Sequence, residues 1–287
     1  MDISVITPVY YGNKYLNHYM KMMNMAVGNT EALVEVILVN DSPSIDIEFD
    51  RKLVKGYEVR IVENEINSGI HASRVHGLKE SSGRYILFLD QDDLISEHSL
   101  ETQYAAVKDA DVVLGNGLFE INGKREKIFG NRFSQRFATH EWVYKWIRDF
   151  IVSPGQCLIK KSSIPEYWKN NTIKNNGTDD YLLWLLMFNN NMKMVCNYNT
   201  VYLHRNTGVN ISADEEKMTG STNEMLKILE NYQNYNRDTV RFMRRRIEYK
   251  KVNRNNKKTF LMQTSKNIDI FMVNLLYRLL WRGCIIR

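Results

Sequence analysis

The first 120 residues alternate between two apolar patterns, and this alternation restricts the fold more than any other feature of the chain. Short runs rich in β-branched residues predict strands that are buried on both faces. Helical patterns separate these runs, and alternating strands and helices predict a layered α/β domain with a mostly parallel central sheet flanked by helices. The predicted strands are Ile3–Pro8, Glu35–Asn40, Val59–Val62, Tyr85–Leu89 and Asp111–Leu114, and the helices are Lys14–Val27, His71–Ser81 and Ser96–Val107.

After Asn116 the elements become shorter and more mixed. The pair Asn122-Gly123 predicts a hairpin turn, because these residues tolerate the positive φ that such turns require. The remaining patterns predict helices at Glu141–Phe150 and Asp179–Asn190, and strands at Gln156–Lys160, Met192–Cys196 and Val201–Arg205.

The charge of the chain is distributed unevenly. The 287 residues carry a formal net charge of +6, which by itself would suggest a nucleic-acid partner. From Asn223 onward there are 15 basic and 5 acidic residues, which leaves 24 basic and 28 acidic residues before it. A mildly acidic body, 1–222, is therefore joined to a basic helical extension, 223–287. The acidic body contains no groove-reading module, so we expect no nucleic-acid partner.

The extension ends in an amphipathic helix predicted over Ile268–Arg287. Asn274, Arg278 and Arg282 are four residues apart and form a polar stripe on an otherwise apolar helix. Basic residues beside such a helix are typical of a segment that lies on an anionic membrane, so residues 237–287 are predicted to contact a membrane surface. The alternative is a helical appendage that packs on the catalytic domain or in a homo-oligomer.

Cysteine usage and hydrophobic content indicate a cytoplasmic protein, peripheral on the inner face of the plasma membrane if the extension binds there. The three cysteines are too few and too scattered for a disulfide framework or a zinc site. The start of the chain lacks the basic and apolar regions of a signal peptide, and no run of about 18 apolar residues predicts a spanning helix.

The acidic run Asp90-Gln91-Asp92-Asp93, directly after the strand Tyr85–Leu89, is the sharpest polar feature. Crowded carboxylates raise each other's pKa unless a cation neutralises them. Oxygen ligands at a strand end suit Mg²⁺ or Mn²⁺ held together with substrate phosphates. A solvated acidic turn or a helix cap is the alternative. We favour the metal site, because ligands of such sheets bind at the carboxyl ends of the strands.

Two further polar residues follow predicted strands. Arg74 lies just inside a helix after the Gly69 turn, where its guanidinium could pair with a diphosphate or lie on a solvated face. Asp41 ends the second strand, where it could accept a hydrogen bond from a base or ribose, or simply shape the turn.

Two charged pairs occur later in the chain. Asp179 and Asp180 open a helix, where negative charge is favourable, but two adjacent carboxylates exceed what capping needs and suggest a general base. His204 and Arg205 end the last strand, where the imidazole could complete a metal shell and the guanidinium could hold phosphate oxygens. An ordinary hydrogen-bonding histidine is the alternative.

Taken in order, these motifs resemble those of the family 2 glycosyltransferases, which are inverting enzymes of the GT-A fold that use nucleotide-activated sugars. The resemblance covers about residues 2–212. Departures from the family pattern are Asn40 in place of an aspartate, Val75-His76 after the arginine, and Asp179 in place of a glutamate. The motifs are Val5–Tyr10, Val36–Ser42, Asn67–Arg74 with Gly77, Ser82–Asp93, Ser153–Gln156 with Leu158-Ile159, Thr178–Asp180 with Trp184, and His204-Arg205.

The resemblance implies a catalytic domain over 1–222, divided into a nucleotide-sugar-binding half, 1–116, and an acceptor half, 117–222. It implies Asp180 as the general base, with Asp179 as the next candidate. A divalent cation, Mn²⁺ or Mg²⁺, would be held by Asp92 with His204 and Asp93. The implied nucleotide contacts are Pro8, Tyr10, Asp41, Asn67, Gly69, Arg74, Asp90, Gln91 and Arg205.

The implied activity is transfer of a sugar from a nucleoside-diphosphate donor, expected to be a UDP-sugar, with inversion at the anomeric carbon. The acceptor would be a hydroxyl of a glycan or a lipid-linked glycan in surface polysaccharide synthesis. Two alternatives are a nucleotidyltransferase that makes the activated sugar, and a membrane- or nucleic-acid-binding protein that acts through the basic tail. The first would carry a Gly-rich basic loop after the first strand, which Pro8–Asn13 lacks.

Overall fold

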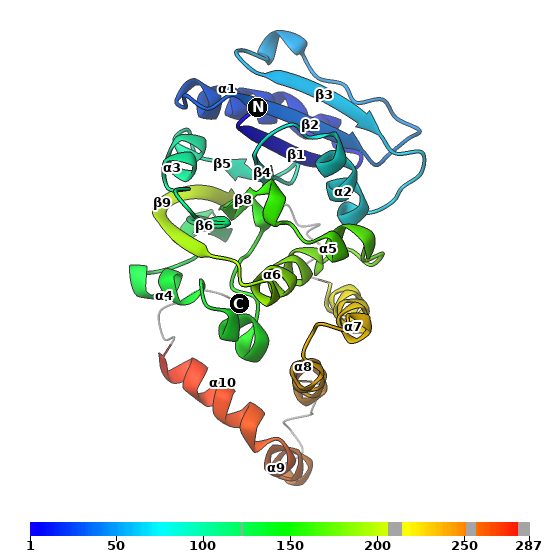
Figure 1. The fold of residues 1–287 in the computed structure, drawn as a ribbon, viewed down its shortest axis with the longest axis vertical. Coiled ribbons are helices and arrows are strands. Elements are labelled where there is room, and N and C mark those ends of the chain that lie inside the picture. Colours follow the sequence, from blue (N-terminus) through cyan, green and yellow to red (C-terminus); the bar gives the residue numbers. More distant parts are fainter. Residues whose placement is uncertain (122, 206–213, 251–256, 281–287) are drawn as a thin grey trace.

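The computed structural model describes residues 1–121, 123–205, 214–250 and 257–280. A nine-stranded sheet forms the centre of the molecule, in the order β3-β2-β1-β4-β8-β6-β9-β5, with β7 paired to β6 (Figure 1). The strands are β1 (Ile3–Val9), β2 (Val34–Asn40), β3 (Glu58–Glu63), β4 (Tyr85–Phe88), β5 (Leu94–Ile95), β6 (Val112–Ile121), β7 (Lys124–Lys127), β8 (Cys157–Lys160) and β9 (Met194–His204).

The two halves of the sheet differ in strand direction. β3, β2, β1 and β4 are all parallel, as the alternation of strands and helices predicted. Beyond β4 the sheet is mixed: β8 pairs antiparallel with both β4 and β6, whereas β6 and β9 are parallel. The predicted α/β class with a flanked central sheet is confirmed, and the parallel half brings the carboxyl ends of β1, β2 and β4 to one edge.

Helices cover the sheet on both sides, and α6 is buried on nearly every face. Eight successive residues of α6, from Tyr181 to Phe188, are buried, which is the pattern of a helix inside a protein core. The helices are α1 (Asn13–Gly28), α2 (Ile70–Glu80), α3 (Ser99–Ala105), α4 (Arg132–Phe137), α5 (Glu166–Asn170), α6 (Asp179–Asn189), α7 (Glu215–Asn231), α8 (Arg237–Lys250), α9 (Lys257–Lys266) and α10 (Ile268–Leu280).

Several predicted boundaries were wrong. The helix expected at Glu141–Phe150 is a short π-helical turn, η2 (Val143–Ile147), which ends because Arg148 is fully extended. The strands expected at Met192–Cys196 and Val201–Arg205 are a single strand, β9, because an irregularity in its pairing with β6 accommodates the residues between them. Asn122 of the predicted hairpin lies outside the described residues, although β6 and β7 do pair antiparallel on either side of it.

The extension packs on the rest of the protein through α7, α8 and α10, where the ring of Tyr277 in α10 lies 5.9 Å from that of Phe150 between centroids. Met225, Leu226 and Leu229 of α7 belong to the same buried core as the sheet. α8 reaches η2 through an edge-to-face contact of Phe242 with Trp146, at 4.6 Å between ring centroids. Among the described helices none is both long and apolar enough to span a bilayer. Arg282 of the predicted polar stripe lies outside the described residues.

Candidate active site

The loops after β1 and β4 are joined at the carboxyl edge of the parallel strands. Gln91 accepts a hydrogen bond from the Tyr10 backbone N–H at 3.0 Å, and its amide nitrogen donates to the Tyr10 carbonyl at 3.0 Å. A Cβ atom on Gly12 would lie only 1.9 Å from Gln91 Oε1, so glycine is needed for this approach. With its backbone held by these two hydrogen bonds, Tyr10 keeps its side chain 50% exposed, whereas Pro8 is buried within β1.

Asp41, at the end of β2, shapes a neighbouring loop. Its buried carboxylate accepts hydrogen bonds from the backbone N–H groups of Ser68 and Gly69, at 2.7 and 2.9 Å, and from the Asn64 amide at 2.8 Å. Gly69 has a φ of 83°, which glycine adopts without strain. Asp41 therefore holds the turn that precedes α2, while Asn67 in that turn is exposed.

Arg74 of α2 lies inside the protein and bridges two of the predicted acidic motifs. Its Nη1 is 2.7 Å from Asp179 Oδ2, and its Nη2 is 2.6 Å from Asp90 Oδ1. The Arg74 side chain is 3% exposed. Its guanidinium thus ties the end of β4 to the start of α6, although these segments are far apart in the sequence.

Asp179 and Asp180 are adjacent in sequence but differ in environment. Asp179 is held by Arg74, and its carbonyl accepts a hydrogen bond from the Trp168 indole at 2.8 Å. Burial alone would raise the pKa of Asp179, but the charges of Arg74 and His71 and the hydrogen bond from Arg74 outweigh it and lower this pKa. The pKa of Asp180 is raised well above its usual value by burial and by the charges of Asp149 and Asp179. Asp179 is therefore a structural anion, and Asp180 is the carboxylate suited to accept a proton.

Asp149, which the sequence analysis did not identify, lies beside Asp180 in the segment after η2. Burial raises the pKa of Asp149 to about 7, although its Oδ1 accepts a hydrogen bond from the Ile151 N–H at 2.9 Å. No motif surrounds it in the sequence, and only the folded chain places it near α6. Two carboxylates in one environment hold a proton more strongly than either alone.

Asp93 and His204 form the second acidic corner, where β9 meets the loop after β4. Asp93 Oδ1 is 3.3 Å from His204 Nδ1, and its Oδ2 accepts a hydrogen bond from the Tyr202 hydroxyl. Arg205 Nε donates to the Asp92 carbonyl at 2.7 Å. Tyr202 was not predicted, but it lies two residues before His204, and side chains two apart in a strand share a face.

The carboxylates of the acidic loop are buried close together, and this raises the pKa of two of them. Burial and the charges of Asp93 and Asp92 raise the pKa of Asp90 to about 6, despite the pairing with Arg74. Burial and Asp93 also raise the pKa of Asp92. Burial alone would lower the pKa of His204, but Asp93 and the other two aspartates reverse this effect and raise it.

The chemistry of this corner fits a divalent cation. Within the described ranges, no three side chains of His, Cys, Asp or Glu already stand together as a metal-ligand cluster. Since Asp93 faces His204 Nδ1, the other ring nitrogen, Nε2, lies on the opposite side of the ring, as in histidines that bind metals with a carboxylate behind them. Asp92 and His204 would then supply two ligands and leave the rest to phosphate oxygens and water.

Comparison with known proteins identifies related sequences. The chain is 33% identical to glycosyltransferase GlyG of Streptococcus pneumoniae over 118 residues, which cover 40% of this chain and 38% of GlyG. It is 25% identical over 191 residues to WfgD of Escherichia coli, described as a UDP-Glc:alpha-D-GlcNAc-diphosphoundecaprenol beta-1,3-glucosyltransferase. That alignment covers 66% of this chain and 70% of WfgD.

A solved structure and a family profile also match this chain. The structure of residues 1–349 of S. aureus TarS in complex with UDP-GlcNAc matches with a TM-score of 0.59 and 18% identity, over 94% of this chain and 81% of the TarS chain. The likeness to TarS supports the GT-A fold. The profile of glycosyl transferase family 2 matches residues 4–168, more than half of the chain. The chain therefore belongs to glycosyl transferase family 2.

Proposed function

We propose that this enzyme transfers a sugar from a UDP-sugar to a hydroxyl of a glycan or lipid-linked glycan, with inversion at the anomeric carbon. The observation that carries the proposal is the crowding of three carboxylates within Asp90–Asp93 at the carboxyl edge of the parallel strands, where burial and mutual repulsion raise the pKa of Asp90 and of Asp92. Such a loop is stabilised by a cation, and a cation in turn binds the diphosphate of the donor.

The nucleotide would lie across the ends of β1 and β2. The exposed ring of Tyr10 offers a flat surface for a base, and Gln91 fixes the backbone of Tyr10. Asp92 and His204 would hold Mn²⁺ or Mg²⁺, with Asp93 orienting the imidazole. When bound, the cation neutralises charge on the diphosphate as it leaves.

Asp180 would act as the general base. The acceptor oxygen forms a bond to the anomeric carbon, the bond from that carbon to the diphosphate oxygen breaks, and the acceptor proton passes to Asp180. A pKa raised above the usual range improves a carboxylate as a base, because catalysis is most efficient when this pKa is near the working pH. A single displacement of this kind inverts the anomeric centre and needs no covalent intermediate.

Arg74 would act as a positioning residue. Predicted from the sequence as a diphosphate contact, it lies buried between Asp90 and Asp179, at 2.6 and 2.7 Å. By joining these carboxylates it fixes the donor loop relative to the first turn of α6, which carries Asp180. Catalytic groups lose effectiveness when their spacing changes by about 1 Å, so this bridge would matter for the rate.

The names of the relatives support the substrate class. WfgD is described as acting on a diphosphoundecaprenol-linked sugar, and the TarS structure contains UDP-GlcNAc. On this basis we propose a UDP-sugar as the donor and polysaccharide synthesis as the process.

The extension would bring the enzyme to a lipid-linked acceptor. α10 exposes Ile268, Met272, Leu275 and Leu276, whose spacing places them on one face of the helix. An exposed apolar helix face in a basic segment is the pattern of a helix that lies in the membrane interface. A full chain with Met272→Ser and Leu276→Ser, two exposed positions of α10, should float less with anionic vesicles than the native chain does, and equal flotation would refute this role.

A screen of nucleotide sugars tests the proposed donor. UDP-, GDP- and dTDP-sugars are added with Mn²⁺ or with EDTA, and the melting temperature of the full chain is measured. A ligand that binds the native state at 100 times its Kd stabilises it by about 2.7 kcal/mol, so a UDP-sugar should raise the melting temperature by several degrees with Mn²⁺ only. A nucleotidyltransferase would instead release pyrophosphate from UTP and a sugar 1-phosphate.

A further inference from the structure

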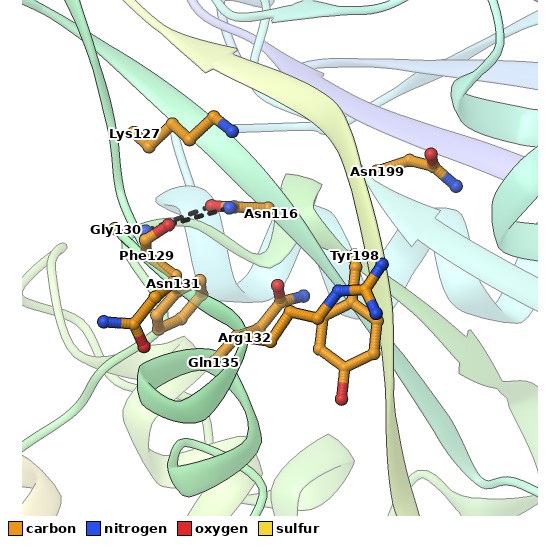
Figure 2. A pocket seen from close by; sticks show the side chains of 9 residues that line it. All are labelled: Asn116, Lys127, Phe129, Gly130, Asn131, Arg132, Gln135, Tyr198 and Asn199. Atoms are coloured by element: carbon orange, nitrogen blue, oxygen red, sulfur yellow. Dashed lines mark hydrogen bonds between the residues drawn. The ribbon is translucent and has the colours of Figure 1, made fainter.

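A second concave site lies on the acceptor half, where β6, β9 and the segment leading into α4 meet (Figure 2). Its volume is about 280 Å³, just below the roughly 300–1,000 Å³ of sites for drug-sized ligands. None of the nine residues that line it is acidic, and two of them, Lys127 and Arg132, are basic. The space is therefore suited to one small polar ligand with negative charge.

A local irregularity of the sheet forms one wall of this cavity. Along β6 and β9, Gly115 is opposite Asn197 and Asn116 is opposite Thr200, so Tyr198 and Asn199 have no partners in β6. Extra residues of this kind re-aim side chains at functional sites. Tyr198 and Asn199 are both exposed and line the cavity, as Figure 2 shows.

The opposite wall is fixed before any ligand arrives. The Asn116 side chain donates to the Phe129 carbonyl at 2.9 Å and accepts from the Phe129 N–H at 3.0 Å (Figure 2). Buried Gln135 donates to the carbonyls of Leu114 and Asn197, at 2.9 and 2.7 Å. These bonds hold the segment before α4 against β6 and β9, so binding would not have to order it.

The guanidinium of Arg132 is oriented so that its N–H groups remain available to a ligand. Its guanidinium lies over the Tyr198 ring, 4.9 Å from the centroid, which orients the planar group without using its N–H edge. Neither Arg132 nor Lys127 forms an ion pair with any acidic side chain in the described part of the chain. An arginine in this state binds phosphate or carboxylate through paired hydrogen bonds.

We propose that this cavity binds an anionic sugar unit, one that carries a phosphate or a carboxylate. Arg132 and Lys127 would hold the anionic group, and the exposed Tyr198 ring and the Asn199 amide would contact the sugar. Asn199 precedes His204 by five residues, about 16 Å along a strand, so the cavity is separate from the donor corner. The assignment of this anionic sugar to the acceptor chain rests on the proposed function. The binding of an anionic sugar in the cavity does not depend on it.

The test is a calorimetric titration of the full chain in EDTA with glucose 1-phosphate, glucose and inorganic phosphate. Arg132→Ala should weaken glucose 1-phosphate binding at least tenfold, because a hydrogen bond to a charged group is worth about 1.5–3 kcal/mol. Tyr198→Ala should weaken it less. Arg136→Ala is the matched control: it removes the same charge from the same helix but does not line the cavity, and it should leave the affinity unchanged.

The outcomes separate this site from the proposed function. Equal losses in Arg132→Ala and Arg136→Ala, or no loss in either, would overturn the site. Inorganic phosphate that binds as tightly as glucose 1-phosphate would overturn the sugar part of the proposal. The native chain and both variants are also titrated with UDP and Mn²⁺. Failure of UDP to bind counts against the proposed function, whereas failure of glucose 1-phosphate alone counts against this cavity.

Discussion

The acidic loop after β4 and the basic helix α8 both concentrate like charges, but they differ in how those charges are compensated. In α8, Arg241 pairs with Asp238, Arg244 with Glu230 and Arg245 with Asp269, at 2.7 to 2.8 Å. In the acidic loop, burial and mutual repulsion still raise the pKa of Asp90 and Asp92. The comparison suggests that dense charge favours a ligand where buried like charges still repel one another, and packing where each charge lies beside an opposite one.

The same comparison refines the prediction for the extension. The Arg244-Arg245-Arg246 cluster suggested a membrane contact in the sequence. In the structure, the first two arginines form ion pairs within the protein, and Arg246 is buried, with Tyr181 of α6 close enough to influence its pKa. A membrane contact of the described extension therefore depends on the apolar face of α10 more than on these arginines.

The largest effect is expected at the proposed base. Asp180→Asn removes the proton acceptor but keeps its shape, so kcat should fall by about 10²–10⁴-fold while the affinity for UDP changes less than about twofold. Initial rates and calorimetry with UDP measure the two quantities. Asp238→Asn, in α8, is the control and should keep native turnover. Native turnover in Asp180→Asn would remove Asp180 from the mechanism and leave Asp179 as the next candidate.

The second largest effect is expected on stability, when the buried ion-pair bridge of Arg74 to Asp90 and Asp179 is broken. Arg74→Met leaves Asp90 and Asp179 without their common cation, so the free energy of unfolding should fall by about 3–5 kcal/mol, as measured by urea denaturation. Arg241→Met is the control, because this exposed arginine pairs with an exposed aspartate and should matter by about 0.2–1 kcal/mol. Equal losses of unfolding free energy in the two variants would show that the buried Arg74 bridge stabilises the protein no more than an exposed ion pair does.

The pH dependence of turnover should reveal the effect of Asp149 on the pKa of Asp180. The negative charge of Asp149 raises the pKa of Asp180, and the base must be deprotonated to work, so native turnover should fall as the pH drops through this raised pKa. Asp149→Asn removes that charge and should move the acidic limb of the kcat profile to lower pH. An unmoved limb would mean that Asp149 does not act on the base.

The smallest effect is expected at a surface pair of the extension. Glu230→Gln removes the partner of Arg244, and both side chains are more than a third exposed. The free energy of unfolding should therefore fall by less than about 1 kcal/mol, with turnover unchanged. A loss of 2 kcal/mol or more in urea denaturation would show that paired charges of α8 matter as much as buried ones.

Much of the parallel half could be predicted because three of its strands, β1, β2 and β4, are fully buried and their pattern is local. These strands are mostly apolar, and polar residues follow each of them at the sheet edge, whereas β3 is only partly buried. The π-helical turn at Val143–Ile147 and the irregularity at Tyr198 and Asn199 depend on tertiary pairing, so no local pattern indicates them.

The candidate site could be predicted as a set of residues but not as a set of contacts. The pattern indicated that Asp41, Arg74 and Asp179 are polar residues near a ligand. It did not show that their side chains bind other parts of the protein, because the partners lie from 16 to 105 residues away in the chain. Asp149 had no motif, and its proximity to Asp180 is visible only after folding.

The central claim is that the crowded acidic loop Asp90–Asp93 binds a cation that holds the donor. It is tested most directly by measuring UDP release from the donor sugar selected by the thermal screen, with Mn²⁺ and with EDTA, for the native protein, Asp92→Asn and Asp238→Asn. The account predicts Mn²⁺-dependent release for the native protein and Asp238→Asn, and strongly reduced release for Asp92→Asn. Equal release in EDTA, or native release by Asp92→Asn, would contradict it.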